Sequence, residues 1–472
     1  RSRWLDPQRR GPRGAGGGAA RMIVVKFGGT SVGDADAIDR AAAIVRERLP
    51  RQPMVVVSAL GGATNALIAI TQQASEGQLI SAIRGVEALR DRHMEAAERL
   101  LKPGPGLHEV QAELGVTFDE LAHLAEALST LGHATARARD AIAAKGELLS
   151  SVLVVAAFRE RGIPATWVDP TTVMITTDQF EKAEPRPDRI AEASQRLLRP
   201  LLAQGQVPVV GGYVGATDHG IVTTLGRGGS DYSASLFGAA LGAEAIEIWT
   251  DVDGMLTADP RVVPSARLID RIRFDEASEL ASFGAKVLHP STISPAVRLG
   301  IPVWIFNSRK PQGTGTLITF EAPRRPVSAI AGKSGVTIVK VRSPRMLLQH
   351  GFLRSIFDIF DRHRTSVDVV ATSEISVSVT IDDATHLDSL VVELSQLGDV
   401  SVERNRGIVA LVGAGMGESS EAMAAALGAL RELRVHMLSL SASAINLTMI
   451  VDGDQVSTAM GRLHHAFFPG DA

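Results

Sequence analysis

A lysine and two glycines directly follow the first apolar run of the chain, and this combination is suited to binding phosphate. Four of the five residues from Ile23 to Phe27 are apolar, which predicts a short buried strand. Without a Cβ, Gly28 and Gly29 let backbone N–H groups approach anionic oxygens closely, and Lys26 adds a positive charge. A bare Gly-Gly pair is more often a simple tight turn, so the motif gains weight only from partners elsewhere.

Two further turns supply such partners. The first, GRGGSD at 226–231, carries Arg227, whose planar guanidinium can hold a carboxylate through two charge-assisted hydrogen bonds. The second, WTDVDG at 249–254, is rich in hydrogen-bond acceptors. Phosphoryl transfer asks a protein mainly for positioning and charge neutralisation, so each turn is suited to one part of that task.

The elements that must position these turns alternate between strand and helix. From Met22 to Phe320, short β-rich apolar runs alternate with helical patterns such as the one expected from Asp34 to Pro50. The pattern predicts an α/β fold with a parallel sheet, helices on both sides, and all three turns at the carboxyl ends of strands. Residues 75–145 lack strand signals and predict a helical insertion. The expected strands are Ile23–Phe27, Met54–Val57, Val207–Val210, Ala245–Trp249 and Pro302–Phe306.

The last third of the chain predicts a different architecture. After a proline-bearing connector at 321–326 come two units, each with the order strand, helix, strand, strand, which indicates a ferredoxin-like βαββαβ repeat. The first unit is expected from Thr337–Val341, Gly351–Arg362, Val367–Ala371 and Ile375–Ile381, and the second from Ile408–Val412, Ser420–Leu430, Val435–Ser439 and Ile445–Val451.

Composition limits the class of protein. The 472 residues are 45% hydrophobic and 21% charged, as in globular proteins of two to four domains. No apolar run approaches the roughly 18 residues of a membrane span; the richest, Leu149–Phe158, predicts a buried helix. The absence of cysteine excludes disulfides and thiolate sites and fits a cytoplasmic location.

The first 21 residues differ from the rest. They carry a net charge of +5 against a total of −3, which leaves an acidic body of −8 with 4% aromatic residues. Such a body has neither the basic stripe nor the stacking platforms of a nucleic-acid binder. The Arg- and Gly-rich leader is expected to be a disordered extension, with Met22 as the natural start.

Five strings together resemble aspartate kinases, in that family's order and at about its spacing. They are KFGGTSV at 26–32, KGELLS at 145–150, TTLGRGGSDYSAS at 223–235, WTDVDGMLTADPRVV at 249–263 and FGAKVLHP at 283–290. The resemblance extends from Met22 to the C-terminus. It implies a monofunctional aspartate kinase with an amino-acid kinase domain at 22–320, a first ACT domain at 336–401, and a second formed by 325–335 with 402–470.

The resemblance implies phosphorylation of the side-chain carboxylate of L-aspartate by ATP. Lys26 is similar to the residue that stabilises the transferring phosphate, and Asp231 to one that orients Lys26 and the substrate amine. Ser58 is similar to a hydroxyl donor beside the phosphates, although a helix N-cap is an equal interpretation from the residues alone. Glu147 alone would be interpreted as an ordinary helix residue. The implied aspartate contacts are Thr64, Asn65, Glu147, Arg227, Ser230 and Asp231.

For the nucleotide, the resemblance implies contacts on both sides of the third turn. Leu256 lies where some relatives have tyrosine; a contact to ATP through the backbone would be kept here, whereas a contact through the ring would be lost. The sequence has no evident carboxylate cage, so Mg²⁺ is expected on the ATP phosphates and water. His464 and His465 are interpreted as a helix surface pair. The implied ATP contacts are Lys26, Gly28, Gly29, Ser58, Thr250, Asp251, Leu256, Arg261 and Lys286.

The first ACT unit is expected to bind an end-product amino acid at a subunit interface. Asp368 would pair with its ammonium, which favours lysine as effector with threonine as the alternative; Gln349 departs from a serine of some lysine-sensitive relatives. A homodimer or homotetramer through the ACT domains is implied. The implied effector contacts are Met346, Gln349, Gly351, Phe352, Leu353, Asp368, Ser373 and Glu374.

Other functions remain open from the residues alone. A second amino-acid kinase of this fold, acting on glutamate, N-acetylglutamate or carbamate, predicts a different helical insertion and no paired ACT units. A non-catalytic amino-acid sensor predicts loss of the charged site residues, which are all present here. A further alternative is that the chain is the kinase part of a longer fused enzyme. That enzyme would have a different architecture and the same kinase chemistry.

Overall fold

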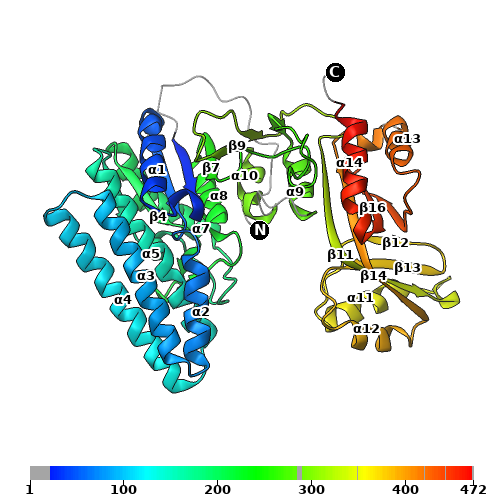
Figure 1. Ribbon diagram of the computed structural model, residues 1–472, viewed down its shortest axis with the longest axis horizontal. Helices are drawn as coiled ribbons and strands as arrows, with labels where there is room; N and C mark the ends of the chain where they lie inside the picture. Colours follow the sequence, from blue (N-terminus) through cyan, green and yellow to red (C-terminus); the bar gives the residue numbers. More distant parts are fainter. Residues whose placement is uncertain (1–21, 284–289, 348, 419, 442, 470–472) are drawn as a thin grey trace.

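The computed structural model describes residues 22–283, 290–347, 349–418, 420–441 and 443–469, which form two halves (Figure 1). They correspond to the kinase domain and the paired ACT units expected from the sequence, and are called here the kinase half and the regulatory half after that expectation. The kinase half contains an eight-stranded sheet in the order β3-β4-β2-β1-β7-β9-β10-β8. Its strands are β1 (Ile23–Phe27), β2 (Pro53–Val57), β3 (Ala165–Val168), β4 (Val207–Gly211), β7 (Ala245–Thr250), β8 (Arg271–Ile272), β9 (Val303–Asn307) and β10 (Thr316–Ile318).

Six of these strands are parallel, as expected for a parallel-rich sheet, and the far edge of the sheet is antiparallel to them. β10 pairs antiparallel with β9, with Thr316 opposite Ile305. Only a short segment joins the two strands, and a short connection can form a hairpin but not a parallel crossover. Gly315 in this segment has φ 64°, and a Cβ there would lie 2.4 Å from the Ile305 carbonyl oxygen, so the turn requires glycine.

Helices cover both faces of the sheet, and the strand pleat decides which face each side chain of β1 meets. Ile23, Val25 and Phe27 pack in a core with the helices from α1 to α5, whereas Val24 packs in a second core with α7 to α10. Lys26 therefore points to the side of α8. The helices are α1 (Ala35–Arg48), α2 (Ala63–Ser75), α3 (Leu79–Leu100), α4 (Pro105–Leu131), α5 (Ala136–Glu160), α6 (Pro170–Val173), α7 (Pro187–Ala203), α8 (Gly229–Leu241), α9 (Phe274–Ser282) and α10 (Ser294–Leu299).

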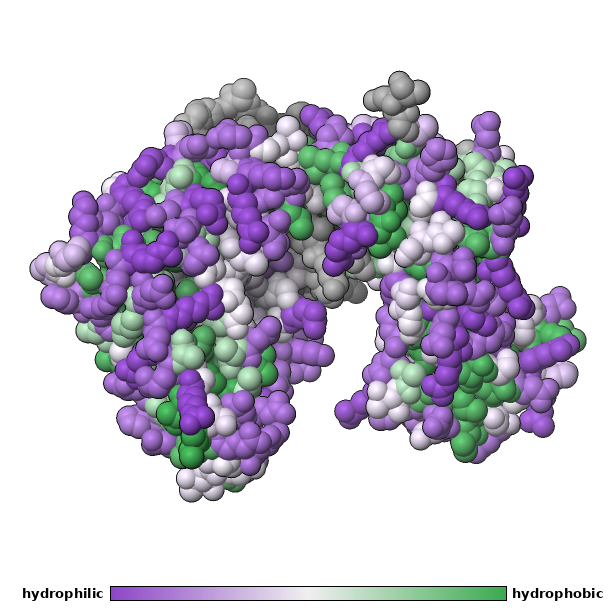
Figure 2. All heavy atoms as spheres, viewed as in Figure 1, coloured by the Kyte–Doolittle hydropathy of each residue, from purple (hydrophilic) through white to green (hydrophobic). Residues whose placement is uncertain are grey.

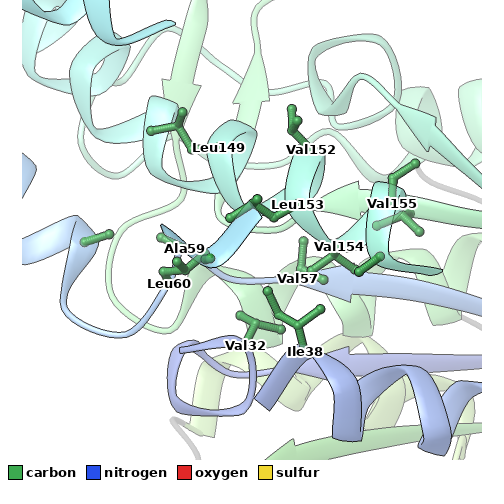
Figure 3. Packing of buried hydrophobic residues seen from close by; sticks show 14 of the residues in the cluster. Val32, Ile38, Val57, Ala59, Leu60, Leu149, Val152, Leu153, Val154 and Val155 are labelled. Carbon is green, nitrogen blue, oxygen red and sulfur yellow. The ribbon is translucent and has the colours of Figure 1, made fainter. Parts of the chain in front are cut away.

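The buried helix α5 is the centre of the first core. Figure 3 shows apolar side chains of α5 together with Val57 of β2 and Ile38 of α1; those of α5 are Leu149, Val152, Leu153, Val154 and Val155. By length and composition alone α5 could cross a membrane, but 78% of its most apolar window is buried inside the protein, as in the core helix of a globular protein. The predicted helical insertion is present as α3, α4 and the start of α5.

The regulatory half contains one six-stranded sheet in the order β12-β13-β11-β14-β16-β15. Each of its halves carries two helices and repeats the predicted order strand, helix, strand, strand. The elements are β11 (Ala329–Arg342), α11 (Phe352–Arg362), β12 (Val370–Thr372), β13 (Ser376–Ile381), α12 (Leu387–Leu394), β14 (Asp399–Val412), α13 (Ser420–Ala429), β15 (Met437–Leu440), β16 (Asn446–Asp452) and α14 (Val456–Phe467).

The two regulatory units share their longest strands. The pairing of β11 with β14 begins with Ala329 opposite Val412 and ends with Arg342 opposite Asp399. The sequence analysis assigns 325–335 to the second unit and an element at 337–341 to the first, and the chain runs through both regions as one strand with irregular pairing near Ser334 and Val336. The first half of β11 therefore belongs to the second unit, and its second half belongs to the first.

The kinase and regulatory halves meet at the segment 255–268. Ala258 and Val263 of this segment pack inside the core of the second regulatory unit. The Ile330 N–H of β11 donates to the Thr257 carbonyl at 2.8 Å. His464 lies 2.9 Å from the Thr257 hydroxyl and is 1% exposed, so the predicted surface pair is wrong for this histidine. His465 is exposed, as predicted.

Candidate active site

The first glycine turn is built where β1 ends in the middle of the sheet. Lys26 is buried, and its Nζ lies 2.5 Å from Asp231 Oδ1 of α8. The Gly28 N–H donates to the Trp249 carbonyl at 3.0 Å, while Gly29 lines an adjacent cavity. A Cβ on Gly29 would lie 3.1 Å from the Ala59 carbonyl oxygen, so this close approach favours glycine. The turn thus presents a held lysine and a partly exposed Gly29, whereas the Gly28 N–H is already paired within the protein.

The second glycine turn is not at the end of a strand of the main sheet, contrary to the sequence-based expectation. It follows β6 (Val222–Thr224), which pairs only with β5 (Val214–Ala216) among the described residues. The turn instead contacts the main sheet through Ser230, next to the ends of β4 and β2. A Cβ on Gly212, directly after β4, would lie 2.6 Å from that of Ser230, and Ser58 at the end of β2 donates to the Ser230 hydroxyl at 2.8 Å.

Glu147 is a buried carboxylate on the wall of the cavity. Its side chain is on α5 and the residue is 3% exposed; one oxygen accepts a 3.3 Å hydrogen bond from the Ala59 N–H. The other oxygen, Oε2, is buried without a hydrogen-bond partner among the described residues. Burial raises the pKa of Glu147 to about 8, although the Ala59 N–H and the Lys26 charge lower it in part. Such a carboxylate is suited to receiving a cationic group.

One open cavity of about 870 Å³ brings together the predicted aspartate contacts. Arg227 is exposed on its wall, and Thr64 and Asn65 enter from the first turn of α2. Neither Asp231 nor Lys26 is on this wall; Asp231 pairs with Lys26 and directly follows Ser230, which is on the wall. The predicted site residues on the wall are Gly29, Ser58, Thr64, Asn65, Glu147, Arg227 and Ser230.

The predicted nucleotide contacts from Thr250 to Arg261 lie outside the cavity wall. Thr250 ends β7 and Asp251 follows it, while Arg261 is exposed and bonded to Asp259 at 2.6 Å. Leu256 forms a bridge with Leu268 and is partly buried. Lys286 lies outside the described residues.

Comparison with known proteins gives one answer. A family model described as the amino acid kinase family matches residues 21–307, and an ACT domain model matches residues 409–467. Lysine-sensitive aspartokinase 3 of Escherichia coli is 38% identical, with 95% of this chain and all of the relative aligned. Chloroplastic aspartokinase 2 of Arabidopsis thaliana is 34% identical, with 97% of this chain and 86% of the relative aligned.

The chain belongs to the aspartokinase family. A crystal structure of E. coli aspartokinase III with aspartate and ADP, in the R-state, matches with a TM-score of 0.82 at 38% identity, over 95% of this chain and 100% of that one. The same enzyme with lysine and aspartate, in the T-state, matches with a TM-score of 0.79, over 95% of this chain and 99% of that one. The resemblance, the fold class and the enzyme class predicted from the sequence are confirmed.

The effector residues predicted for this aspartokinase gather around the first regulatory unit. Met346 ends a short 3-10 turn, Gly351 caps α11 at φ 83°, and Phe352 is buried in the core of the unit. Asp368 is already paired: the Nζ of Lys333 lies 3.1 Å from it and 2.6 Å from Asp382. The remaining predicted effector residues are exposed: Gln349, Leu353, Ser373 and Glu374.

The sequence analysis missed several residues of this aspartokinase. Ser31 is buried and its hydroxyl donates to the Trp249 carbonyl at 3.0 Å; its place inside KFGGTSV was a usable signal. Tyr213 lines the cavity with φ 65°, and burial raises its pKa. Asp140 and Lys333 gave no local signal, because their partners are distant in sequence.

Proposed function

We propose that this aspartokinase transfers the γ-phosphoryl group of ATP to the side-chain carboxylate of L-aspartate and forms 4-phospho-L-aspartate. The observation that carries the proposal is the cavity in which buried Glu147, with its unpartnered oxygen, and exposed Arg227 share a wall with Gly29 and Ser58. A carboxylate and a guanidinium fit the ammonium and a carboxylate of an amino acid. Glycine backbone and hydroxyls fit phosphate.

Lys26 is the proposed catalytic residue. Its ammonium would neutralise charge on the transferring phosphoryl group, and Asp231 holds it at 2.5 Å. A general base is not required, because the attacking carboxylate of aspartate is ionised at neutral pH. Among the described residues no group of three or more His, Asp or Glu could hold a metal ion. We therefore assign Mg²⁺ to the ATP phosphates and water, where it would neutralise phosphate charge.

We also infer feedback inhibition by lysine, with threonine as the alternative, at the Asp368 site. The lysine-sensitive name of the E. coli relative supports this assignment. A homodimer or homotetramer through the regulatory half is supported by its exposed apolar side chains, which include Leu353, Phe357 and Val370. Figure 2 shows hydrophobic residues gathered on the lower part of this half. A cytoplasmic location fits the lack of cysteine.

Trapping of acyl phosphate with hydroxylamine tests the function directly. Purified protein with Mg-ATP is given aspartate, glutamate or N-acetylglutamate, each with and without lysine or threonine. We expect acyl phosphate to form with aspartate and not with glutamate or N-acetylglutamate. The amount formed should fall when lysine is present. Lys26→Ala should lower kcat by about 10²- to 10³-fold, the scale of losing one oriented donor. Folded wild-type protein that gives no product with any acceptor would favour the amino-acid sensor.

A further inference from the structure

Asp140 is a buried carboxylate near the cavity that the proposed chemistry does not use. It is 2% exposed and lies on α5. Its oxygens accept the Glu181 N–H at 3.1 and 2.9 Å, the Thr224 N–H at 3.0 Å, and the Thr224 hydroxyl at 2.7 Å. An ionised carboxylate is an acceptor only, and every group that faces Asp140 in these contacts is a donor. The contacts are therefore fully matched in chemical type.

These bonds join the two sides of the proposed aspartate site. Asp140 and Glu147 are seven residues apart on α5, which is about two helical turns, so they lie on the same face of that helix. Thr224 is the last residue of β6 and stands three residues before Arg227. One carboxylate thus links the helix that carries the proposed ammonium receptor to the loop that carries the proposed carboxylate clamp.

The loop between Thr224 and Arg227 has little freedom to absorb a change. The Leu225 N–H donates to the Tyr213 carbonyl at 2.9 Å. Gly226 has φ 76°, and a Cβ there would lie 3.1 Å from the Glu181 carbonyl oxygen. Glu181, whose N–H Asp140 also holds, therefore supports the same turn from the opposite side. A shift of Thr224 would be passed to Arg227 through two closely packed residues.

We propose that Asp140 is a positioning residue that holds Glu147 and Arg227 in place relative to each other, and that it thereby determines the affinity for aspartate and the selectivity for aspartate over glutamate. The proposal rests on the proposed function. Aspartate and glutamate differ by one methylene in the side chain, while the ammonium and the carboxylate on the α-carbon are equally far apart in both. With these two groups held by Glu147 and Arg227, the length of the side chain decides whether its carboxylate reaches the phosphate, and one methylene is worth about 10- to 200-fold in kcat/KM.

Two substitutions at Thr224 separate positioning from a general loss of stability. Thr224→Val keeps the shape of the side chain but removes the hydroxyl donor at 2.7 Å, which leaves a buried carboxylate oxygen short of a partner. Thr224→Ser keeps the hydroxyl and is the rescue variant. Asp140→Asn places an amide NH₂ among N–H donors and is the stronger lesion.

Glu247→Gln is a matched control for a buried carboxylate elsewhere. Glu247 is 2% exposed on β7 and is held by Arg48 at 3.1 Å and Arg51 at 2.9 Å. The substitution removes a charge from a comparable environment without touching the 177–231 region. It is expected to lower Tm and to leave the KM for aspartate unchanged.

The experiment measures KM for aspartate and for ATP, the ratio of kcat/KM between aspartate and glutamate, Tm, and aspartate binding by calorimetric titration. Thr224→Val is expected to raise the KM and Kd for aspartate on the order of tenfold, as for loss of one partner of a buried charged group. It should also reduce the preference for aspartate over glutamate and leave the KM for ATP unchanged. Thr224→Ser should retain wild-type values, and Asp140→Asn should show the larger change in the same direction.

The proposal would be overturned if Thr224→Val and Asp140→Asn lowered Tm but left both the affinity for aspartate and the preference for aspartate over glutamate unchanged. Asp140 would then be a structural residue. The titration separates this failure from that of the proposed function. Wild-type protein that binds aspartate without phosphorylating it refutes the function, and the Kd values of the variants still decide the role of Asp140. Wild-type protein that neither binds nor phosphorylates aspartate overturns both.

Discussion

At the residue scale, the protonation of Glu147 is expected to control aspartate binding. With its pKa raised to about 8 by burial, Glu147 is mostly protonated in the free protein at neutral pH. Receiving the substrate ammonium requires the carboxylate, so binding at pH 6 to 7 must first remove a proton. The affinity for aspartate should therefore increase as pH rises from 6 to about 8 and then level off.

Measured Kd values for aspartate between pH 6 and 8.5 test this expectation. Glu147→Gln should remove the pH dependence and weaken binding by roughly 1.5–3 kcal/mol at the upper end, because a bond to a charged group is lost. The folded pKa lies above the ordinary value of 4.5, so the folded state keeps its proton between about pH 4.5 and 8. Stability should fall as pH rises through that window, and the variant should lack this slope. Flat wild-type affinity would show that another group receives the ammonium.

The sequence predicts site residues that are carried by compact motifs and misses those defined by distant partners. Lys26 and Gly29 belong to one short motif, and the cavity contains much of the predicted set. Asp140 is paired with Thr224, 84 positions away, and nothing around either residue indicates that pairing. The burial of Glu147 likewise depends on the packing of α5 as a whole, so its raised pKa has no sequence signal.

At the scale of elements, short buried strands were predictable and pairing irregularities were not. β1 has the predicted bounds, because a mostly apolar run next to a glycine turn has few other interpretations. The antiparallel β10 is only three residues long, which is too short to give a pattern. β12 begins at Val370, three residues after its predicted start, because its pairing with β13 begins there.

Strand β11 is expected to carry a lysine that competes with the effector. Lys333 holds Asp368 at 3.1 Å and Asp382 at 2.6 Å, so an effector ammonium at Asp368 must share that carboxylate with a resident ammonium. Lys333→Met removes the competitor. Because the pair is partly exposed, the gain should be about 1 kcal/mol, which is roughly a fivefold lower concentration of lysine for half inhibition.

Lys340→Met is the matched control on the same strand, because Lys340 pairs with Glu403 at 2.5 Å and does not contact Asp368. Inhibition curves for both variants against wild type are the measurement. Lysine sensitivity should be unchanged in the Lys340 variant. A requirement for more lysine in Lys333→Met would instead mean that Lys333 keeps the site in shape for the effector.

At the scale of the whole molecule, the two halves share a loop rather than a simple linker. The segment 255–268 begins beside the proposed nucleotide contacts and packs with Ala258 and Val263 in the regulatory core. Its Thr257 is bonded by Ile330 of β11 through the backbone and by His464 of α14 through the side chain. The sequence could not predict this contact, since His464 and Thr257 are 207 positions apart.

This shared loop predicts that a change in α14 alters ATP affinity. His464→Phe keeps a ring that can pack against Phe468, as His464 does with ring centroids 4.9 Å apart, but removes the buried bond to Thr257 and the 3.4 Å contact with Ser265. Loss of one buried hydrogen bond costs about 1 kcal/mol, and here it should make Leu256 and Arg261 less firmly held. The KM for ATP should therefore rise roughly fivefold, and the KM for aspartate should stay unchanged.

The acid stability of the junction is expected to depend on the same histidine. Burial, and then the nearby Arg267 charge, lowers the pKa of His464 from 6.5, so the folded state resists its protonation. The contribution of His464 to stability is therefore present above pH 6.5 and is lost as pH falls towards its folded pKa. Thermal unfolding between pH 5 and 7.5 should show this loss in wild type and less of it in His464→Phe.

One outcome would contradict the expected link between α14 and ATP binding. If His464→Phe changed the KM for aspartate and left the KM for ATP unchanged, the shared loop would not act on the nucleotide contacts, and the regulatory half would have to reach the cavity by another route.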